Sequence, residues 1–102
     1  PWELSKGFDS SAVLGEFRSI EAYDINNIDF SLTIDDEEVQ HANTSQMLFP
    51  VDEVIAYVSR FCTLKTGDLI FTGTPAGSGP VSIGTRLKGY IGEEKVLDFQ
   101  VR

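Results

Sequence analysis

The chain has 102 residues, enough for one domain or part of one, and a net charge of −8 from sixteen acidic and eight basic residues. Hydrophobic residues make up 41% and charged residues 24%, which is typical of a globular protein and not of a disordered one. Nucleic acids and anionic membranes are recognised through basic surfaces. The acidic composition therefore argues against both as partners.

The single cysteine, Cys62, excludes a disulfide within the chain and leads us to expect a cytoplasmic protein. No apolar run approaches the length of a membrane span. No signal peptide is visible, but the sequence starts at Pro1 and not at Met, so it does not exclude a signal peptide upstream.

The N-terminal part contains a lysine beside a glycine, Lys6-Gly7, where a chain reversal can aim the amine at one spot. The residues alone favour a solvated surface lysine at this position and a turn residue or cap at Ser10. The apolar side chains of residues 11–29 fit neither the helical nor the strand period. We expect a loop with short strand pieces there.

A β-hairpin is predicted next. Residues 30–34 alternate apolar and polar side chains, residues 35–38 turn the chain, and residues 39–42 return as a second strand. Asp36 tolerates a left-handed backbone better than most residues, though less well than glycine. The acidic run lacks the spacing of a calcium loop, and we interpret it as a solvated turn. The only histidine, His41, is interpreted as an exposed strand residue.

The polar cluster Asn43-Thr44-Ser45 follows the hairpin and has two possible roles. It can line the mouth of a substrate site, or it can form a turn held by its own side chains. The residues alone favour the turn.

One amphipathic helix is predicted over residues 50–62, because its apolar residues recur on a single face. Pro50 suits the first helical position, and Asp52 and Glu53 suit the positive end of the helix dipole. Burial of each large side chain is worth roughly 1.5–3 kcal/mol, so we expect this face to dock against the rest of the fold. The apolar positions are Val51, Val54, Ile55, Val58, Phe61 and Cys62.

The run Leu69-Ile-Phe71 predicts a buried strand that leads into a loop rich in Thr, Gly and Pro at residues 72–80. Such a loop can offer amide and hydroxyl groups to an oxygen-rich ligand. The composition alone favours an ordinary turn that ends the strand. The loop is not a nucleotide P-loop, because no Gly-Lys-[Ser/Thr] follows, and Ser82 stands where G-x-G-x-x-G needs its third glycine.

Two further strands are predicted at residues 84–91 and 95–101, joined by a tight turn at residues 92–94. Leu97, Phe99 and Val101 share one face of the last strand. The pattern predicts an α+β fold, mainly antiparallel β with one helix packed on it.

Four stretches together closely resemble the fumarylacetoacetate hydrolase family. They are Lys6-Gly-Phe-Asp9 with Ser10, then Gln40-His-Ala-Asn-Thr-Ser-Gln-Met47, then Ile55-Ala-Tyr-Val-Ser59, and finally residues 64–79, which contain Thr72-Gly-Thr-Pro75. The resemblance extends from Trp2 to the last strand. It implies a mixed β-roll or sandwich. Ser78 departs from the family, which usually has an apolar residue there.

The resemblance also implies a function. Family members act on small 2-oxo or β-dicarbonyl acids by C–C hydrolysis, decarboxylation, hydration or isomerisation. They bind Mg²⁺ or Mn²⁺, a Lewis acid that can stabilise a developing enolate. By resemblance, Lys6 is the catalytic lysine beside the metal and Ser10 lies near that site. Thr74, Gly73 and Thr44 are then the candidates for substrate binding.

The family's metal ligands, a Glu-x-Glu pair and an Asp, lie upstream of the Lys6 block, as does its catalytic His-Glu pair, so His41 takes no catalytic role. We therefore interpret residues 1–102 as the later part of a single catalytic domain with no metal ligand in this chain. We expect the 102 residues alone to be inactive and to bind Mg²⁺ with millimolar or weaker affinity. The intact parent is expected to be a homodimer that binds a small anionic carboxylic acid.

The main alternative is a non-catalytic β module that associates with itself or a partner through exposed sheet edges. A nucleotide-binding loop at residues 73–79 is a third and weaker alternative, and it predicts protection by ATP or GMP in thermal melts.

Substitution of the candidate lysine separates the enzyme from the β module. In the intact parent, Lys6→Ala should abolish most turnover while the circular dichroism spectrum and melting temperature stay unchanged, because a solvated lysine contributes little to folding. Unchanged turnover in the folded variant would favour the binding module.

Overall fold

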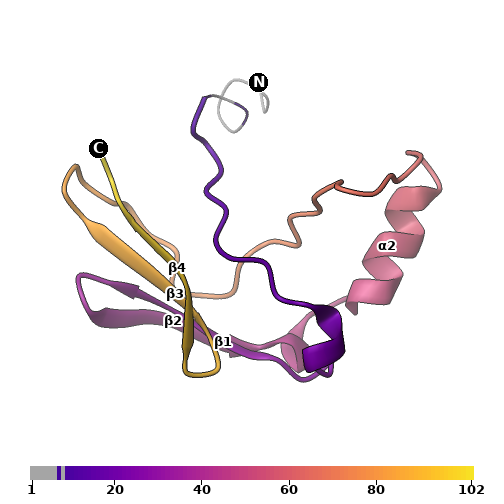
Figure 1. The fold of residues 1–102 in the computed structure, drawn as a ribbon, viewed down its shortest axis with the longest axis horizontal. Coiled ribbons are helices and arrows are strands. Elements are labelled where there is room, and N and C mark those ends of the chain that lie inside the picture. Colours follow the sequence, from indigo (N-terminus) through magenta and orange to yellow (C-terminus); the bar gives the residue numbers. More distant parts are fainter. Residues whose placement is uncertain (1–6, 8) are drawn as a thin grey trace.

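The computed structural model describes Gly7 and residues 9–102, which form a four-stranded antiparallel sheet and one α-helix (Figure 1). The sheet order is β2-β1-β3-β4. The predicted α+β class, mainly antiparallel with one helix, is confirmed. The elements are η1 (Ile20–Ala22), β1 (Asp29–Ile34), β2 (Glu37–Asn43), η2 (Thr44–Gln46), α2 (Val51–Ser59), β3 (Arg86–Ile91) and β4 (Glu94–Gln100).

Both predicted hairpins are present, with strand ends that differ from the expectation by a few residues. The β1–β2 turn consists of Asp35 and Asp36, whose φ values of 49° and 66° are both left-handed. Positive φ at both central residues is the mark of a type I′ turn, which matches the twist of the paired strands. Asp36 thus has the left-handed backbone conformation that it was expected to tolerate. The β3–β4 turn begins at Gly92, with φ 58°.

A glycine lies against a bulge in each of the two edge strands. In β2 the register skips Val39, since Leu32 pairs with Gln40 and Thr33 with Glu38. A methyl group on Gly77 would overlap the carbonyl oxygen of Val39.

The other edge repeats this arrangement. The β3–β4 register skips Val96 in β4, whose carbonyl accepts a hydrogen bond of 2.7 Å from the amide of Glu16. A methyl group on Gly15 would overlap the same carbonyl oxygen. Bulges and covering segments of this kind protect sheet edges from pairing with other chains.

The helix is shorter than predicted and does not dock as predicted. It ends at Ser59, because the amides of Arg60 and Phe61 bond to carbonyls three residues back, which tightens the last turn. Pro50 is the N-cap and not the first helical residue. Figure 1 shows α2 apart from the sheet, and Ile55 and Phe61 are 42% and 70% exposed. The apolar face is therefore largely uncovered by the described residues.

Two expected strand regions are irregular. Residues 69–71 form no strand, and Phe71 is 68% exposed. Within the described part of the chain this run has no neighbouring strand to pair with, and an apolar pattern alone cannot supply one. The expected strand pieces in residues 11–28 are also absent from the described residues there. That segment contains the 3₁₀ turn η1, capped by the side chain of Ser19.

The two faces of the sheet differ in chemistry. Leu87 is the one buried hydrophobic residue in the described part of the chain, 9% exposed, and the register places it on the same face as Ile34 and Phe99. Large apolar side chains elsewhere are exposed, including Phe17 at 75% and Leu48 at 93%. The described residues thus leave much apolar surface in contact with solvent.

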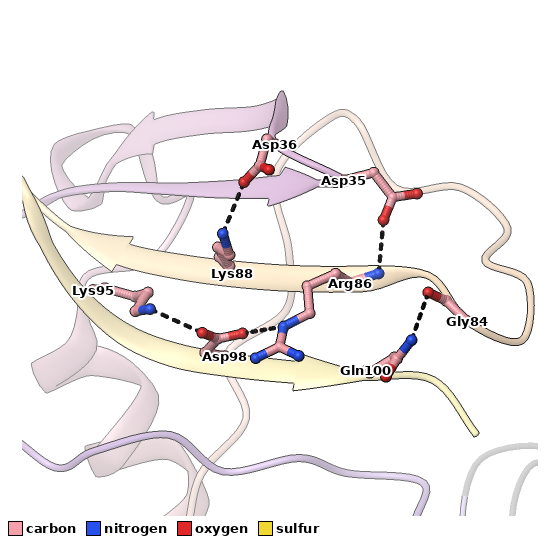
Figure 2. Close-up of polar contacts among 8 residues, drawn as sticks. All are labelled: Asp35, Asp36, Gly84, Arg86, Lys88, Lys95, Asp98 and Gln100. Carbon is pink, nitrogen blue, oxygen red and sulfur yellow. Dashed lines mark hydrogen bonds and ion pairs between the residues drawn. The ribbon is translucent and has the colours of Figure 1, made fainter.

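The opposite face carries ion pairs, which Figure 2 shows. Asp98 lies between Arg86, with Nε at 2.6 Å, and Lys95, with Nζ at 2.8 Å. Lys88 Nζ lies 2.8 Å from Asp36 in the β1–β2 turn. Hydrogen bonds from Arg86 and then Lys95 hold the pKa of Asp98 well below its usual range. The bond to Lys88 likewise lowers the pKa of Asp36.

The lowered pKa of Asp98 predicts an acid-dependent loss of stability. A depressed folded-state pKa stabilises the fold above the unfolded-state value, and this contribution disappears as pH falls toward the folded-state value. Asp98→Asn should lower the melting temperature at neutral pH. It should also flatten the fall in melting temperature between about pH 5 and about pH 2. The matched control is Glu93→Gln, in the exposed β3–β4 turn, which should keep the wild-type profile. Parallel profiles for wild type and Asp98→Asn would contradict the assignment.

Candidate functional site

A groove of about 420 Å³ lies between the end of β2 with η2, the segment that precedes α2, and residues 72–75. This volume suits a small organic ligand. The lining residues are Phe30, Ala42, Asn43, Thr44, Gln46, Met47, Leu48, Phe49, Val54, Thr72, Gly73, Thr74 and Pro75. The lining combines hydroxyl and amide side chains with apolar ones.

Thr44 is fixed by a tight turn at the end of β2. Its Oγ1 accepts a 2.8 Å hydrogen bond from the amide of Ile28, and its own amide donates to the carbonyl of Ile28 at 2.9 Å. Asn43 and Gln46 form a capping box around η2. The sequence left a turn and a substrate mouth as alternatives for this cluster. The turn is present, and Thr44 also lines the groove.

Thr74 is held by the side chain of Gln40 in β2. Gln40 Nε2 lies 2.8 Å from Thr74 Oγ1 and 3.0 Å from the carbonyl oxygen of Pro75. Gly73, with φ 93°, has a backbone conformation that side-chain-bearing residues rarely adopt. The Gly- and Pro-rich loop therefore has a defined conformation, as its composition indicated. The strand expected before it is absent from the described residues 69–71.

The bulge at Val39 explains why Gln40 reaches this loop. Gln40 pairs with Leu32, and Ala42 pairs with Phe30, so the three side chains of Gln40, Ala42 and Phe30 share the apolar face of the sheet. Sequence analysis did not identify Gln40 as a site residue. Its signal is a polar side chain on an apolar face, and this becomes visible only once the register is known.

The predicted site residues have different positions. Thr44, Gly73 and Thr74 line one groove, although their role in binding stays a prediction. Ser10 is exposed with φ 62° and is not part of the groove lining within the described residues. Lys6 lies outside the described residues, and its role also stays a prediction.

The described residues do not fit a metal centre. Among them no group of three or more His, Cys, Asp or Glu side chains is arranged to hold a metal ion, and the groove lining contains no charged side chain. His41 lies 2.7 Å from Asp29 and 3.3 Å from Glu38, and the bond to Asp29 raises its pKa. This exposed cluster is an ion pair on the strand surface, as expected for His41. The described lining can bind acceptor oxygens through hydroxyls and amides, without a charged side chain among its residues.

A family model described as fumarylacetoacetate hydrolase C-terminal matches residues 1–98. The chain belongs to the fumarylacetoacetate hydrolase family. The resemblance carried by the four sequence stretches is thereby confirmed. No helix in the described part of this family member is long and apolar enough to cross a membrane.

Three relatives illustrate the similarity. The mitochondrial oxaloacetate decarboxylase of Dictyostelium discoideum is 39% identical over 99% of this chain and 47% of its own length. The oxaloacetate tautomerase YcgM of Escherichia coli is 40% identical over 85% of this chain and 41% of its own length. The structure of fumarylpyruvate hydrolase from Pseudomonas aeruginosa in complex with Mn²⁺ and pyruvate is 38% identical, with a TM-score of 0.89, over 99% of this chain and 44% of that one. The chain spans about half the length of the curated relatives it matches.

The contact between Gly77 and β2 can be tested with a matched pair of glycines. Gly77→Ala places a methyl against the Val39 carbonyl at φ 104°, whereas Gly79 has a normal φ and open space around it. We expect Gly77→Ala to cost about 1–3 kcal/mol of unfolding free energy and Gly79→Ala less than about 0.5 kcal/mol. Urea denaturation measures both. Equal effects would mean that the loop does not depend on this contact.

Proposed function

We propose that this chain is the later part of a single catalytic domain of the fumarylacetoacetate hydrolase type, in an enzyme that acts on small 2-oxo or β-dicarbonyl acids. The observation that carries the proposal is the groove in which Thr44, Gly73 and Thr74 meet. Its hydroxyl and amide groups suit the oxygens of a carboxylate, and its size suits a small acid. The relatives, named as a decarboxylase, a tautomerase and a hydrolase, support this substrate class.

The reaction class follows from chemistry common to those names. C–C hydrolysis, decarboxylation and tautomerisation of 2-oxo acids all pass through an enolate or a related anion. Thr74 would hold an oxygen of the bound acid through its hydroxyl, with the Gly73 backbone close by. The apolar side chains Phe30, Met47 and Val54 would exclude water from the rest of the ligand. Lys6 is proposed to supply a positive charge, which the described part of the groove lining lacks.

A divalent metal, Mg²⁺ or Mn²⁺, is proposed for the intact domain, supported by the Mn²⁺ in the Pseudomonas aeruginosa structure. When bound, such an ion supplies Lewis-acid stabilisation of the developing enolate. Because the described residues offer no ligand set, we propose that the metal ligands lie outside them.

The exposed apolar surface supports the interpretation as part of a larger domain. Phe17, Leu48 and Phe61 are each at least 70% exposed, and burial of such side chains is worth roughly 1.5–3 kcal/mol each. We propose that the remaining part of the domain and a second copy in a homodimer cover this surface. Cytoplasmic localisation stays a prediction, since the Dictyostelium discoideum relative is named mitochondrial.

The non-catalytic β module is less well supported, because an edge-pairing module needs accessible edges. Segments containing Gly15 and Gly77 lie against the bulges of both edge strands.

Removal of the Thr74 hydroxyl tests the proposed site. In the intact enzyme, Thr74→Val should lower kcat/KM for oxaloacetate about ten- to hundredfold, because a hydrogen bond to a charged group is worth about 1.5–3 kcal/mol. Thr74→Ser should retain most activity, and Thr66→Val, in the turn before Gly67, is the matched control. If Thr74→Val has the kcat/KM of the wild type for every 2-oxo acid tried, Thr74 does not bind the substrate.

A further inference from the structure

The contacts of the Gln40 side chain with the Thr74 hydroxyl and the Pro75 carbonyl determine the direction in which the Thr74 hydroxyl donates its hydrogen bond. One nitrogen, Gln40 Nε2, lies within hydrogen-bond distance of both Thr74 Oγ1, at 2.8 Å, and the Pro75 carbonyl oxygen, at 3.0 Å. A carbonyl oxygen can only accept a hydrogen bond. The amide group of Gln40 must therefore present its NH₂ to Pro75, which decides between the two possible orientations of the side-chain amide.

The same nitrogen then determines the role of the Thr74 hydroxyl. An amide nitrogen has two hydrogens and no lone pair to offer, so it donates to Oγ1 as well as to Pro75. A threonine hydroxyl has one hydrogen and two acceptor positions. Because one acceptor position is occupied by Gln40, the hydroxyl hydrogen must point away from Gln40. Thr74 is exposed and lines the groove, so the groove can receive that hydrogen.

Gln40 is itself held in place. It is half-buried, it follows the Val39 bulge, and its Cγ lies 3.0 Å from the position of a methyl group on Gly77. The close approach of the 73–77 segment to β2 thus leaves little freedom for the Gln40 side chain.

We propose that Gln40 is a positioning residue that fixes Thr74 as a hydrogen-bond donor toward the groove, so that the ligand atom at this position is an acceptor such as a carboxylate or enolate oxygen. This inference rests on the proposed function and assigns Gln40 a part in it. It makes the groove selective at Thr74 for a ligand atom that accepts a hydrogen bond, without any cation in the described lining.

The test is a double-mutant cycle on the intact protein, with pyruvate as the probe in the presence of Mn²⁺, measured by calorimetry. Gln40→Glu keeps the size of the side chain but replaces the donor with a carboxylate, which draws the Thr74 hydrogen toward itself. We expect pyruvate binding to weaken about ten- to hundredfold. Gln40→Met removes the polar group and lets the hydroxyl rotate, and it should weaken binding less than Gln40→Glu.

The second arm combines each change with Thr74→Val. If Gln40 acts through the Thr74 hydroxyl, Gln40→Glu should have little further effect in the Thr74→Val background. Gln100→Glu is the matched control, because Gln100 Nε2 also donates to a backbone carbonyl, that of Gly84 at 3.1 Å, and neither residue is part of the described groove lining. Gln100→Glu should leave pyruvate affinity unchanged. Circular dichroism establishes that each variant is folded.

The outcomes separate this inference from the proposed function. A loss of affinity from Gln40→Glu that is equally large in the Thr74→Val background would overturn the positioning role, as would equal losses from Gln40→Met and Gln40→Glu. If Gln40→Glu binds pyruvate as tightly as the wild type while Thr74→Val binds it more weakly, only the role of Gln40 is rejected.

If Thr74→Val itself binds pyruvate as tightly as the wild type, the proposed substrate site is rejected. If Gln40→Glu does not fold, Gln40→Met is compared alone and in the Thr74→Val background. A positioning role requires that Gln40→Met weakens pyruvate binding when Thr74 is present and has little further effect in the Thr74→Val background. An equal loss in both backgrounds would overturn that role.

Discussion

The contact between Gly77 and the bulged backbone of β2 is the constraint on which the groove depends. The extra residue at Val39 shifts the side chains that follow, so Gln40 lies on the apolar face of the sheet. Only a glycine can approach the Val39 carbonyl this closely, which brings the loop within reach of the Gln40 amide. A backbone irregularity in an edge strand and one missing Cβ thus bring Thr74 to the same groove as Thr44, which is 30 residues away in sequence and held by a separate turn.

The ion pairs and the groove lie on opposite faces of the same sheet, and they have separate physical roles. Arg86, Lys95 and Asp98 stabilise the exposed face through charges that solvent screens. Figure 2 shows this ion-pair face. The groove face combines apolar side chains with a few oriented polar groups, of which Gln40 and Thr74 are hydrogen-bonded to each other. Because the described groove lining carries no charge, the orientation of its hydrogen-bond donors determines which ligand groups these residues accept.

Sequence reasoning predicted the elements whose stability is local. The alternation in residues 30–34 and the turn at Asp35 and Asp36 specify a hairpin without reference to the rest of the chain. Sequence reasoning was wrong where a segment needs another segment, distant in sequence, to pair or pack with. Leu69 to Phe71 have no strand to pair with in the described residues, and α2 does not dock its apolar face there. Gln40 was missed for a related reason, because a bulge changes which face a residue occupies and leaves no mark in the hydrophobic pattern.

A crystal structure of the intact protein with Mn²⁺ and pyruvate tests the central claim most directly. We expect a carboxylate or keto oxygen of pyruvate to lie within hydrogen-bond distance of Thr74 Oγ1. We also expect Gln40 Nε2 to keep both of its present contacts, with Thr74 and with Pro75. Pyruvate bound outside the groove, or Thr74 turned away from it with Gln40 bonded elsewhere, would contradict the proposed roles of Thr74 and Gln40.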